Sequence, residues 1–220
     1  MARIRCWRCG DEQAPAFFCG ACGTVQGLSH DADYFAVLGL PPDPAVDEEA
    51  LAARYYDLSR RLHPDRHQTA DAREQVESVR ATAVLNAAYQ TLRDLESRGR
   101  YWLRRSGEEL GRDNNRVPPE LAELVFEAQE KLAEATSASP AQRAAQRPEL
   151  EALQRSVAAE RTRERAALTD VLASWPPGGN GAANGHDDRA IAARARLKDL
   201  LSRLAYLRTL ERDVASALEE

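Results

Sequence analysis

Residues 47–66 read DEEALAARYYDLSRRLHPDR, and this stretch combines a helix signal with the sharp turn that ends the helix. The acidic residues at 47–49 favour a helix start, because they interact well with the positive end of the helix dipole. The apolar residues that follow at helical spacing are Leu51, Tyr55, Leu58 and Leu62. Pro64 disfavours helical geometry in the residue before it, so we expect the helix to stop by His63. The stretch predicts an amphipathic helix followed by a His63-Pro64-Asp65 loop.

Two further helical patterns flank this stretch. One starts near Asp71, where Glu74 is placed for a capping box. Its apolar residues at helical spacing are Leu85, Ala88, Tyr89 and Leu92. The other pattern is short, and its apolar residues are Tyr34, Val37 and Leu38. Gly39 follows it as the usual residue beyond a helix C-terminus. We expect the two long helices to form an antiparallel pair, with the short helix closing one end.

The composition indicates a mostly α-helical protein. Of the 220 residues, 43% are hydrophobic but only 6% are aromatic, and Ala, Leu, Glu, Arg and Gln are abundant. A net charge of −5 has the wrong sign for a protein that mainly neutralises phosphates, so we expect no nucleic-acid partner. No apolar run approaches the roughly 20 residues of a membrane span, so we expect no membrane partner. The first residues lack a signal-peptide pattern, so we expect a cytoplasmic location.

The chain divides into three segments of different composition, and we predict one domain in each. Residues 1–29 are rich in Cys and Gly, residues 32–107 contain the helical pair, and residues 118–220 contain three long helical patterns. We predict that the last domain is a three-helix bundle with up-down-up connectivity. In its second helix, Glu160 and Glu164 interrupt the apolar stripe, so we expect that helix to be partly exposed there.

The four cysteines form two matching Cys-x-x-Cys-Gly knuckles, made of Cys6, Cys9, Cys19 and Cys22. A tetrahedral ion takes four thiolates from two tight turns, and a Gly after each second Cys lets the turn bend back. We predict a structural zinc ion, because four protein ligands leave no open coordination position. Iron is an alternative occupant of the same ligand set. A redox-active dithiol pair and two disulfides are the alternative interpretations of the pattern.

Three motifs taken together resemble a J-domain. They are DYFAVLGL at residues 33–40, LHPDR at residues 62–66 and LNAAYQTL at residues 85–92. With residues 98–103, RGRYWL, and the C-terminal helical patterns, the chain from Asp33 onward resembles the HscB family, which are J-type co-chaperones of iron–sulfur cluster biogenesis. The cysteine-bearing segment is similar to an extension found on a subset of that family.

This resemblance implies a co-chaperone rather than an enzyme. J-domains bind the ATPase domain of a heat-shock chaperone of the HscA or DnaK type and stimulate its ATP hydrolysis. The residues that the resemblance assigns to chaperone binding are His63, Pro64, Asp65, Arg54, Arg60, Arg61 and Arg66. Independently, a cluster of arginines on an acidic protein can steer one oriented encounter. A solvated helix face without a partner is the alternative interpretation of these arginines.

The first helix of the predicted bundle carries a second candidate surface. Phe126 lies about 150° from the centre of that helix's apolar stripe, so we expect its ring to point outward. A single exposed apolar residue without a function is the alternative. The resemblance implies that this helix binds the iron–sulfur scaffold protein IscU. The positions that it assigns to scaffold binding are Leu121, Ala122, Phe126, Glu127, Glu130 and Tyr206.

Other functions stay open on the sequence alone. They are a general J-domain co-chaperone for unfolded clients, a metal-knuckle nucleic-acid binder, which the net charge opposes, and an enzyme of thiol–disulfide exchange. The remaining side chains of interest are interpreted as structural. We expect Trp7 and Phe18 to pack the metal-binding segment. The histidines that we expect to be solvated are His30, His67 and His186.

Overall fold

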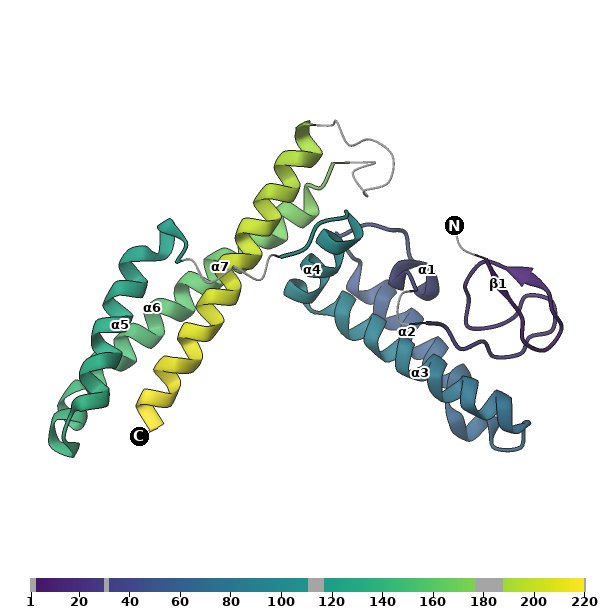
Figure 1. Cartoon of the computed structure of the whole chain (residues 1–220), viewed down its shortest axis with the longest axis horizontal. Helices are drawn as coiled ribbons and strands as arrows, with labels where there is room; N and C mark the ends of the chain where they lie inside the picture. Colours follow the sequence, from purple (N-terminus) through teal and green to yellow (C-terminus); the bar gives the residue numbers. More distant parts are fainter. Residues whose placement is uncertain (1–2, 30–31, 111–116, 177–187, 220) are drawn as a thin grey trace. The chain divides into compact units, whose positions relative to one another are not determined.

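The computed structural model describes residues 3–29, 32–110, 117–176 and 188–219, and most of them lie in helices (Figure 1). The chain divides into two units, Met1–Arg98 and Gly99–Glu220. The mostly α-helical fold class is therefore confirmed. None of the described helices is both long and apolar enough to cross a bilayer.

The first unit contains a small cysteine module (residues 3–29) and a helical domain. In the module, strand β1 (Ile4–Arg5) pairs antiparallel with β2 (Glu12–Gln13), and Phe18 forms an isolated bridge with Val25. The helices that follow are α1 (Tyr34–Leu38), α2 (Glu48–Leu62), the 3-10 helix η1 (Pro64–His67) and α3 (Ala72–Arg93). The short helix and the pair of long helices are thus present where the sequence predicts them.

Local signals explain where these helices begin and end. The Asp47 carboxylate accepts hydrogen bonds from the amides of Glu49 and Ala50 at 3.0 and 3.1 Å, which caps α2. The Asp71 carboxylate accepts from the Glu74 amide at 2.9 Å and caps α3. Gly39 ends α1 with φ 67°, a left-handed conformation that L-residues with a Cβ rarely adopt.

The core of the helical domain lies between α2 and α3. Leu62 from α2 and Leu85 and Leu92 from α3 are completely buried. Beside them the Tyr55 ring stacks on Tyr89 with centroids 4.0 Å apart, and the Tyr55 hydroxyl donates to Asn86 Oδ1 at 3.1 Å. These contacts hold the two helices against each other and thereby place the turn that joins them.

The second unit, Gly99–Glu220, includes the residues 118–220 for which the sequence predicts a three-helix bundle. Helix α4 (Leu95–Arg105) leads into it from the first unit. The elements that follow are the 3-10 helix η2 (Pro119–Leu121), α5 (Ala122–Ser137), α6 (Pro140–Ala173) and α7 (Asp188–Glu219). Helices α6 and α7 pack along each other, and α5 packs against both (Figure 1). The core that the three helices share includes Leu121, Val125, Ala128, Leu153, Val157, Leu207, Leu210 and Val214.

The part of α4 that belongs to the second unit, from Gly99 onward, packs closely on the bundle. Trp102 is buried, and its ring meets that of Trp175 edge to face with centroids 5.8 Å apart. At Gly99 a Cβ atom would lie only 3.2 Å from Leu201 Cδ2, so a glycine here permits the close approach of α4 to the bundle.

At Glu164 the expectation that α6 is partly exposed is wrong. Glu164 is 8% exposed, and its Oε1 lies 3.2 Å from Nη1 of Arg203 on α7, which is 5% exposed. Arg203 Nη2 also donates to Asp199 Oδ2 at 2.7 Å. Burial raises the pKa of Glu164, although the Arg203 guanidinium opposes this. An interhelical ion pair therefore fills the gap in the stripe, and the pattern of one helix alone could not reveal its partner.

Replacing Arg203 with Met should destabilise the bundle by about 3 kcal/mol at neutral pH, because Glu164 would then be a buried charge without its cation. Since burial raises the folded-state pKa of Glu164, the variant can relieve this cost by protonation as the pH falls. Urea unfolding measures the free energy of unfolding at several pH values. The loss in this free energy relative to the unsubstituted protein should shrink as the pH falls from about 7 towards 5.

The matched control for this experiment is the double variant Glu164→Leu/Arg203→Met, which removes both charges. It should recover most of the lost free energy of unfolding. What loss remains should be the same at pH 7 and at pH 5. If Arg203→Met lost the same free energy of unfolding at pH 7 and at pH 5, the prediction would be contradicted.

Candidate functional site

The turn between α2 and α3 is short, ordered and exposed. The Arg66 amide donates to the His63 carbonyl at 2.9 Å, and the Asp65 amide donates to His63 Nδ1 at 3.3 Å. Pro64 occupies the first position of η1, where its fixed φ suits the helical turn. The side chains of His63 and Asp65 are 56% and 73% exposed, and His63 Nδ1 lies 3.5 Å from Asp65 Oδ2. The turn therefore presents an imidazole and a carboxylate side by side to solvent.

Helix α3 anchors the backbone that enters this turn. The Leu62 carbonyl, at the end of α2, accepts hydrogen bonds from the Ser78 hydroxyl at 2.6 Å and the Thr82 hydroxyl at 3.3 Å. These two hydroxyls satisfy a carbonyl that the end of a helix leaves without an intrahelical partner. Neither hydroxyl residue was among the candidates predicted from the sequence. The available signal was a pair of hydroxyl residues four positions apart on a helix that packs against α2.

The arginines expected near the turn are all exposed, and they are Arg54, Arg60, Arg61 and Arg66. Arg61 differs from the others in its contacts. Its Nη1 lies 3.4 Å from Asp57 Oδ2, and its guanidinium carbon lies 4.3 Å from the centroid of the Phe18 ring in the cysteine module. Arg61 is thus engaged within the first unit in addition to being accessible from solvent.

His67 is more enclosed than expected. Its side chain is 15% exposed, its Nδ1 lies 3.7 Å from Glu74 Oε1, and its Nε2 lies 3.1 Å from the Arg61 carbonyl oxygen. The interpretation of His67 as solvated is therefore wrong, because its neighbour in space is a carboxylate from the next helix. His30 and His186 lie outside the described residues.

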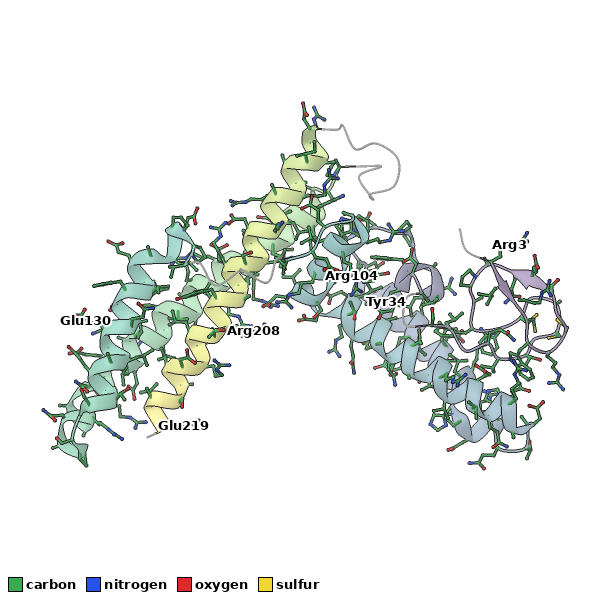
Figure 2. The ribbon with its side chains drawn as sticks, viewed as in Figure 1. Arg3, Tyr34, Arg104, Glu130, Arg208 and Glu219 are labelled. Atoms are coloured by element: carbon green, nitrogen blue, oxygen red, sulfur yellow. The ribbon has the colours of Figure 1, made fainter. Side chains whose placement is uncertain are left out.

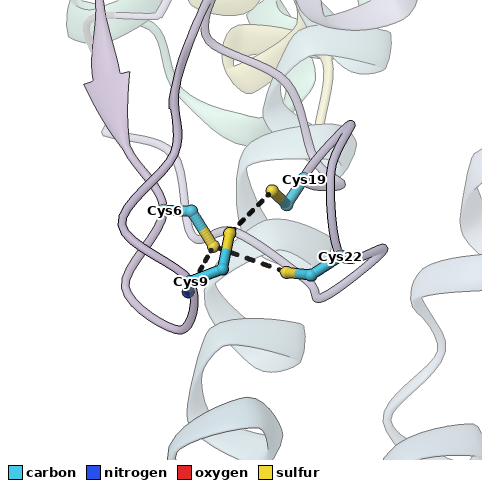
Figure 3. Close-up of side chains that lie close together, drawn as sticks. All are labelled: Cys6, Cys9, Cys19 and Cys22. Atoms are coloured by element: carbon cyan, nitrogen blue, oxygen red, sulfur yellow. Dashed lines mark hydrogen bonds between the residues drawn. The ribbon is translucent and has the colours of Figure 1, made fainter.

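The four cysteine sulfurs converge on one point (Figure 3). All four Sγ atoms lie within 4.8 Å of one another, with 3.7 Å between Cys6 and Cys22 and 3.6 Å between Cys9 and Cys19. A tetrahedral ion with sulfur ligands at about 2.3 Å places the sulfurs roughly 3.8 Å apart, whereas a disulfide requires about 2.05 Å. The geometry fits four thiolates around one metal ion and does not fit the disulfide alternative.

Each knuckle is a tight turn closed by its glycine. The Gly10 amide donates to the Cys6 carbonyl and the Gly23 amide to the Cys19 carbonyl, both at 2.9 Å. The φ angles of Gly10 and Gly23 are 78° and 72°, in the region that glycine adopts without strain. The backbone conformation therefore explains why a glycine follows the second cysteine of each knuckle.

Hydrogen bonds and charge set the protonation of the thiols. Burial alone would raise the pKa of Cys6, but the backbone amides of Cys9 and Arg8 outweigh it and lower the pKa to about 6. The Asp11 amide lowers the pKa of Cys9, but burial and the other sulfurs reverse this and raise it to about 12. Four thiolates at these distances therefore need a cation among them.

Gln26 supports the cysteine cluster from outside the two knuckles. Its side chain is 3% exposed, and its Nε2 donates to Cys6 Sγ at 3.4 Å. A buried amide that donates to a ligand sulfur orients that ligand and stabilises its thiolate form. Gln26 was not predicted from the sequence, because a lone glutamine carries no spacing signal.

On the bundle, Phe126 points outward as helix geometry predicts. It is 70% exposed, and Ala122, Glu127 and Glu130 on the same helix are also exposed. Figure 2 shows Glu130 directed away from α6 and α7. Leu121 is only 1% exposed and Tyr206 is partly buried, and both pack in or against the bundle core. Leu121 is therefore a core residue, and the surface consists of the α5 residues around Phe126.

Comparison with known proteins identifies the family. Residues 33–101 match the DnaJ domain. A co-chaperone protein HscB homologue from Ralstonia nicotianae is 34% identical over 187 residues, which cover 84% of this chain and 94% of that protein. The chain belongs to the HscB family. Members of this family are J-domain co-chaperones and not enzymes.

Two eukaryotic HscB relatives match over shorter regions. The iron-sulfur cluster co-chaperone protein HscB of Homo sapiens is 34% identical over 138 residues, which cover 60% of this chain and 59% of that protein. The iron-sulfur cluster co-chaperone protein HscB homologue of Arabidopsis thaliana is 29% identical over 130 residues, which cover 59% of this chain and 51% of that protein. The match therefore spans between half and two thirds of these two relatives.

Solved HscB structures share the fold. The crystal structure of human co-chaperone protein HscB matches with a TM-score of 0.67 and 26% identity, over 97% of this chain and 98% of that one. Chaperone HscB from Vibrio cholerae matches with a TM-score of 0.56 and 26% identity, over 86% of this chain and 98% of that one. The likeness to HscB thus includes residues of both units.

We expect this HscB-family chain to bind one metal ion through its four cysteines. Elemental analysis after dialysis should give about one metal ion per chain, and Cys6→Ser should abolish retention, because three thiolates leave the tetrahedral shell incomplete. Iodoacetamide should label none of the four thiols in the native metal-bound protein and all of them after chelation and unfolding. Metal-free protein whose Cys6 and Cys22 both react in the native state would refute this prediction.

Proposed function

We propose that this chain is a J-domain co-chaperone of iron–sulfur cluster biogenesis. In this proposal it binds an IscU-type scaffold protein, delivers it to an HscA- or DnaK-type chaperone and stimulates the ATPase of that chaperone. The observation that carries the proposal is the exposed imidazole and carboxylate of His63 and Asp65, held on an ordered turn within the region that matches the DnaJ domain. The names of the human and Arabidopsis relatives, which are iron–sulfur cluster co-chaperones, support the choice of pathway.

The turn is suited to bind another protein rather than to react. Asp65 Oδ1 accepts a hydrogen bond from Gln68 at 3.2 Å, which restrains the carboxylate while its other oxygen stays accessible. Arg60 and Arg66 are exposed close to His63 and Asp65 in the chain, and Arg54 is exposed farther back on α2, so exposed cations accompany the turn on a chain of net charge −5. Such an arrangement attracts an acidic partner surface in one orientation. ATP hydrolysis then takes place on the chaperone.

Replacing Asp65 with Asn should abolish most of the stimulation of the chaperone ATPase. The amide is isosteric but neutral, so the fold should persist while a charge-assisted contact with the partner is lost. The measurement is steady-state ATP hydrolysis by a purified HscA-type chaperone with increasing amounts of this protein. Asp43→Asn is the matched control, because Asp43 is an exposed carboxylate in the loop before α2. Equal stimulation by both variants would contradict the assignment of Asp65.

The scaffold-binding surface that we propose lies on α5. Phe126 supplies an exposed apolar ring, and Glu127 and Glu130 supply negative charge beside it. Aromatic residues that become buried in a protein–protein interface frequently contribute a large share of its binding energy. In this proposal Tyr206 of α7 supports the surface from the bundle core, and Leu121 contributes only by holding α5 in place.

Phe126→Ala should weaken scaffold binding by at least about tenfold, because the ring is the main apolar anchor of the surface. Isothermal titration with a purified IscU-type scaffold measures the affinity, and Ile191→Ala, another exposed apolar side chain in the same unit, is the control. Undiminished affinity would remove Phe126 from the site. Denatured proteins should not compete with the scaffold, and efficient competition would instead support a general co-chaperone for unfolded clients.

We propose that the metal in the cysteine module is a structural zinc ion. Four thiolates complete a tetrahedral shell and leave no position for a substrate. Iron would occupy the same ligands, so the element found in the purified protein distinguishes the two metals. The cytoplasmic location, the absence of nucleic-acid and membrane partners and the three-domain division stay predictions from the sequence.

A further inference from the structure

The cysteine module packs against the helical domain through residues that adjoin its metal ligands. Trp7 and Arg8 lie between Cys6 and Cys9, and Phe18 directly precedes Cys19. The Arg73 guanidinium of α3 lies 4.7 Å from the centroid of the Trp7 ring, and the Arg61 guanidinium of α2 lies 4.3 Å from that of Phe18. Each knuckle therefore contacts the helical domain beside the turn that joins α2 to α3.

Glu74 connects the first knuckle to that turn. Arg8 Nη1 lies 3.1 Å from Glu74 Oε2, and Glu74 Oε1 lies 3.7 Å from Nδ1 of His67, the last residue of η1. The side chains of Glu74 and His67 are 14% and 15% exposed, so both groups are shielded from solvent on most sides. A continuous set of contacts thus runs from the Cys6–Cys9 knuckle through Glu74 to the turn that carries His63 and Asp65.

The end of the module also meets α3 through its backbone. At Gly27 a Cβ atom would meet the Glu77 carboxylate and lie 3.4 Å from Arg80 Cβ. A glycine therefore lets the module's backbone lie directly against α3 at this point. The module is therefore docked at both ends, through its knuckles near η1 and through Gly27 farther along α3.

The conformation of these contacts depends on the cysteines being ligated. A segment of 27 described residues with two short strands has too small a core to fold firmly alone, and metal binding supplies most of its folding free energy. Without the metal, Trp7 and Arg8 are no longer fixed between two ligands, and Glu74 loses its ordered cationic partner. The restraint that Glu74 places on His67 and η1 then weakens.

We propose that the metal-loaded cysteine module acts as a clamp on the His63–Asp65 turn, with Glu74 as the positioning residue that transmits metal occupancy to η1. The coupling is reciprocal, so whatever stabilises the clamped turn also tightens metal binding. The consequence for chaperone stimulation rests on the proposed function, whereas the structural coupling does not.

The direct test measures amide exchange in the turn of the full chain by NMR, with zinc bound and after removal of zinc by a chelator. The informative amides are those of Arg66 and Ala70, which donate to the carbonyls of His63 and His67. Removal of zinc should accelerate their exchange at least about threefold, while buried amides of α5 keep their rates. Unchanged exchange at Arg66 and Ala70 would overturn the proposal.

Point variants test the path of the coupling without removing the metal. Zinc-loaded Glu74→Gln and Arg8→Gln should each accelerate exchange at Arg66 and weaken zinc binding about two- to fivefold in a chelator competition, since partly exposed ion pairs contribute modestly. Arg5→Gln is the matched control, because Arg5 is another arginine of the module that pairs with Glu12 within it. If Arg5→Gln accelerates exchange in the turn as much as Arg8→Gln does, the path through Glu74 is wrong.

A chaperone ATPase assay on the same samples separates the two proposals. Zinc-loaded protein should stimulate hydrolysis more than zinc-free protein, and Glu74→Gln should fall between them. If zinc-loaded, unsubstituted protein stimulates nothing, the proposed function fails while the exchange data still decide the clamp. If stimulation is strong but independent of zinc and of Glu74, the predicted consequence of the clamp for chaperone stimulation is overturned, while the exchange data decide the structural coupling.

Discussion

The packing of α2 against α3 is the constraint on which the rest of the first unit depends. Leu62 is buried at the end of α2 while its carbonyl is held by two hydroxyls from α3, so the apolar contact and the hydrogen bonds fix the same residue. The next residue is His63, and the chain leaves the helix there with Pro64 setting the turn. The backbone that carries the exposed His63 and Asp65 is thereby positioned by contacts of Leu62, in which neither side chain takes part. Exposed side chains on a restrained backbone lose less entropy when a partner binds them.

The features that the sequence predicted correctly are those set by interactions over a few residues. The ends of α1 and α2 follow from Asp47, Pro64 and Gly39, each of which acts on its own helix turn. The cysteine cluster was predictable for a similar reason, since two Cys-x-x-Cys-Gly turns each fix the spacing of two sulfurs. One ion that prefers tetrahedral coordination is then enough to bring the two pairs of sulfurs together.

The features that the sequence could not show depend on partners from distant segments. Glu164 looked like an exposed interruption because its cation, Arg203, is on another helix. His67 looked solvated in the sequence, but Glu74 of α3 lies against it, and Arg8 of the cysteine module pairs with that same Glu74. In each case periodicity described one element correctly, whereas the side chain's environment was decided by a second element.

The exposed face of α5 sets one apolar ring among charged side chains. Burying a phenylalanine side chain in an interface gains about 1.5–3 kcal/mol, and that gain is equally available to a second copy of the same chain. Glu127 and Glu130 beside Phe126 make such self-association unfavourable, because it would bring like charges together. The same two glutamates attract a partner whose matching surface is basic. One aromatic residue can therefore supply affinity while its acidic neighbours supply the choice of partner.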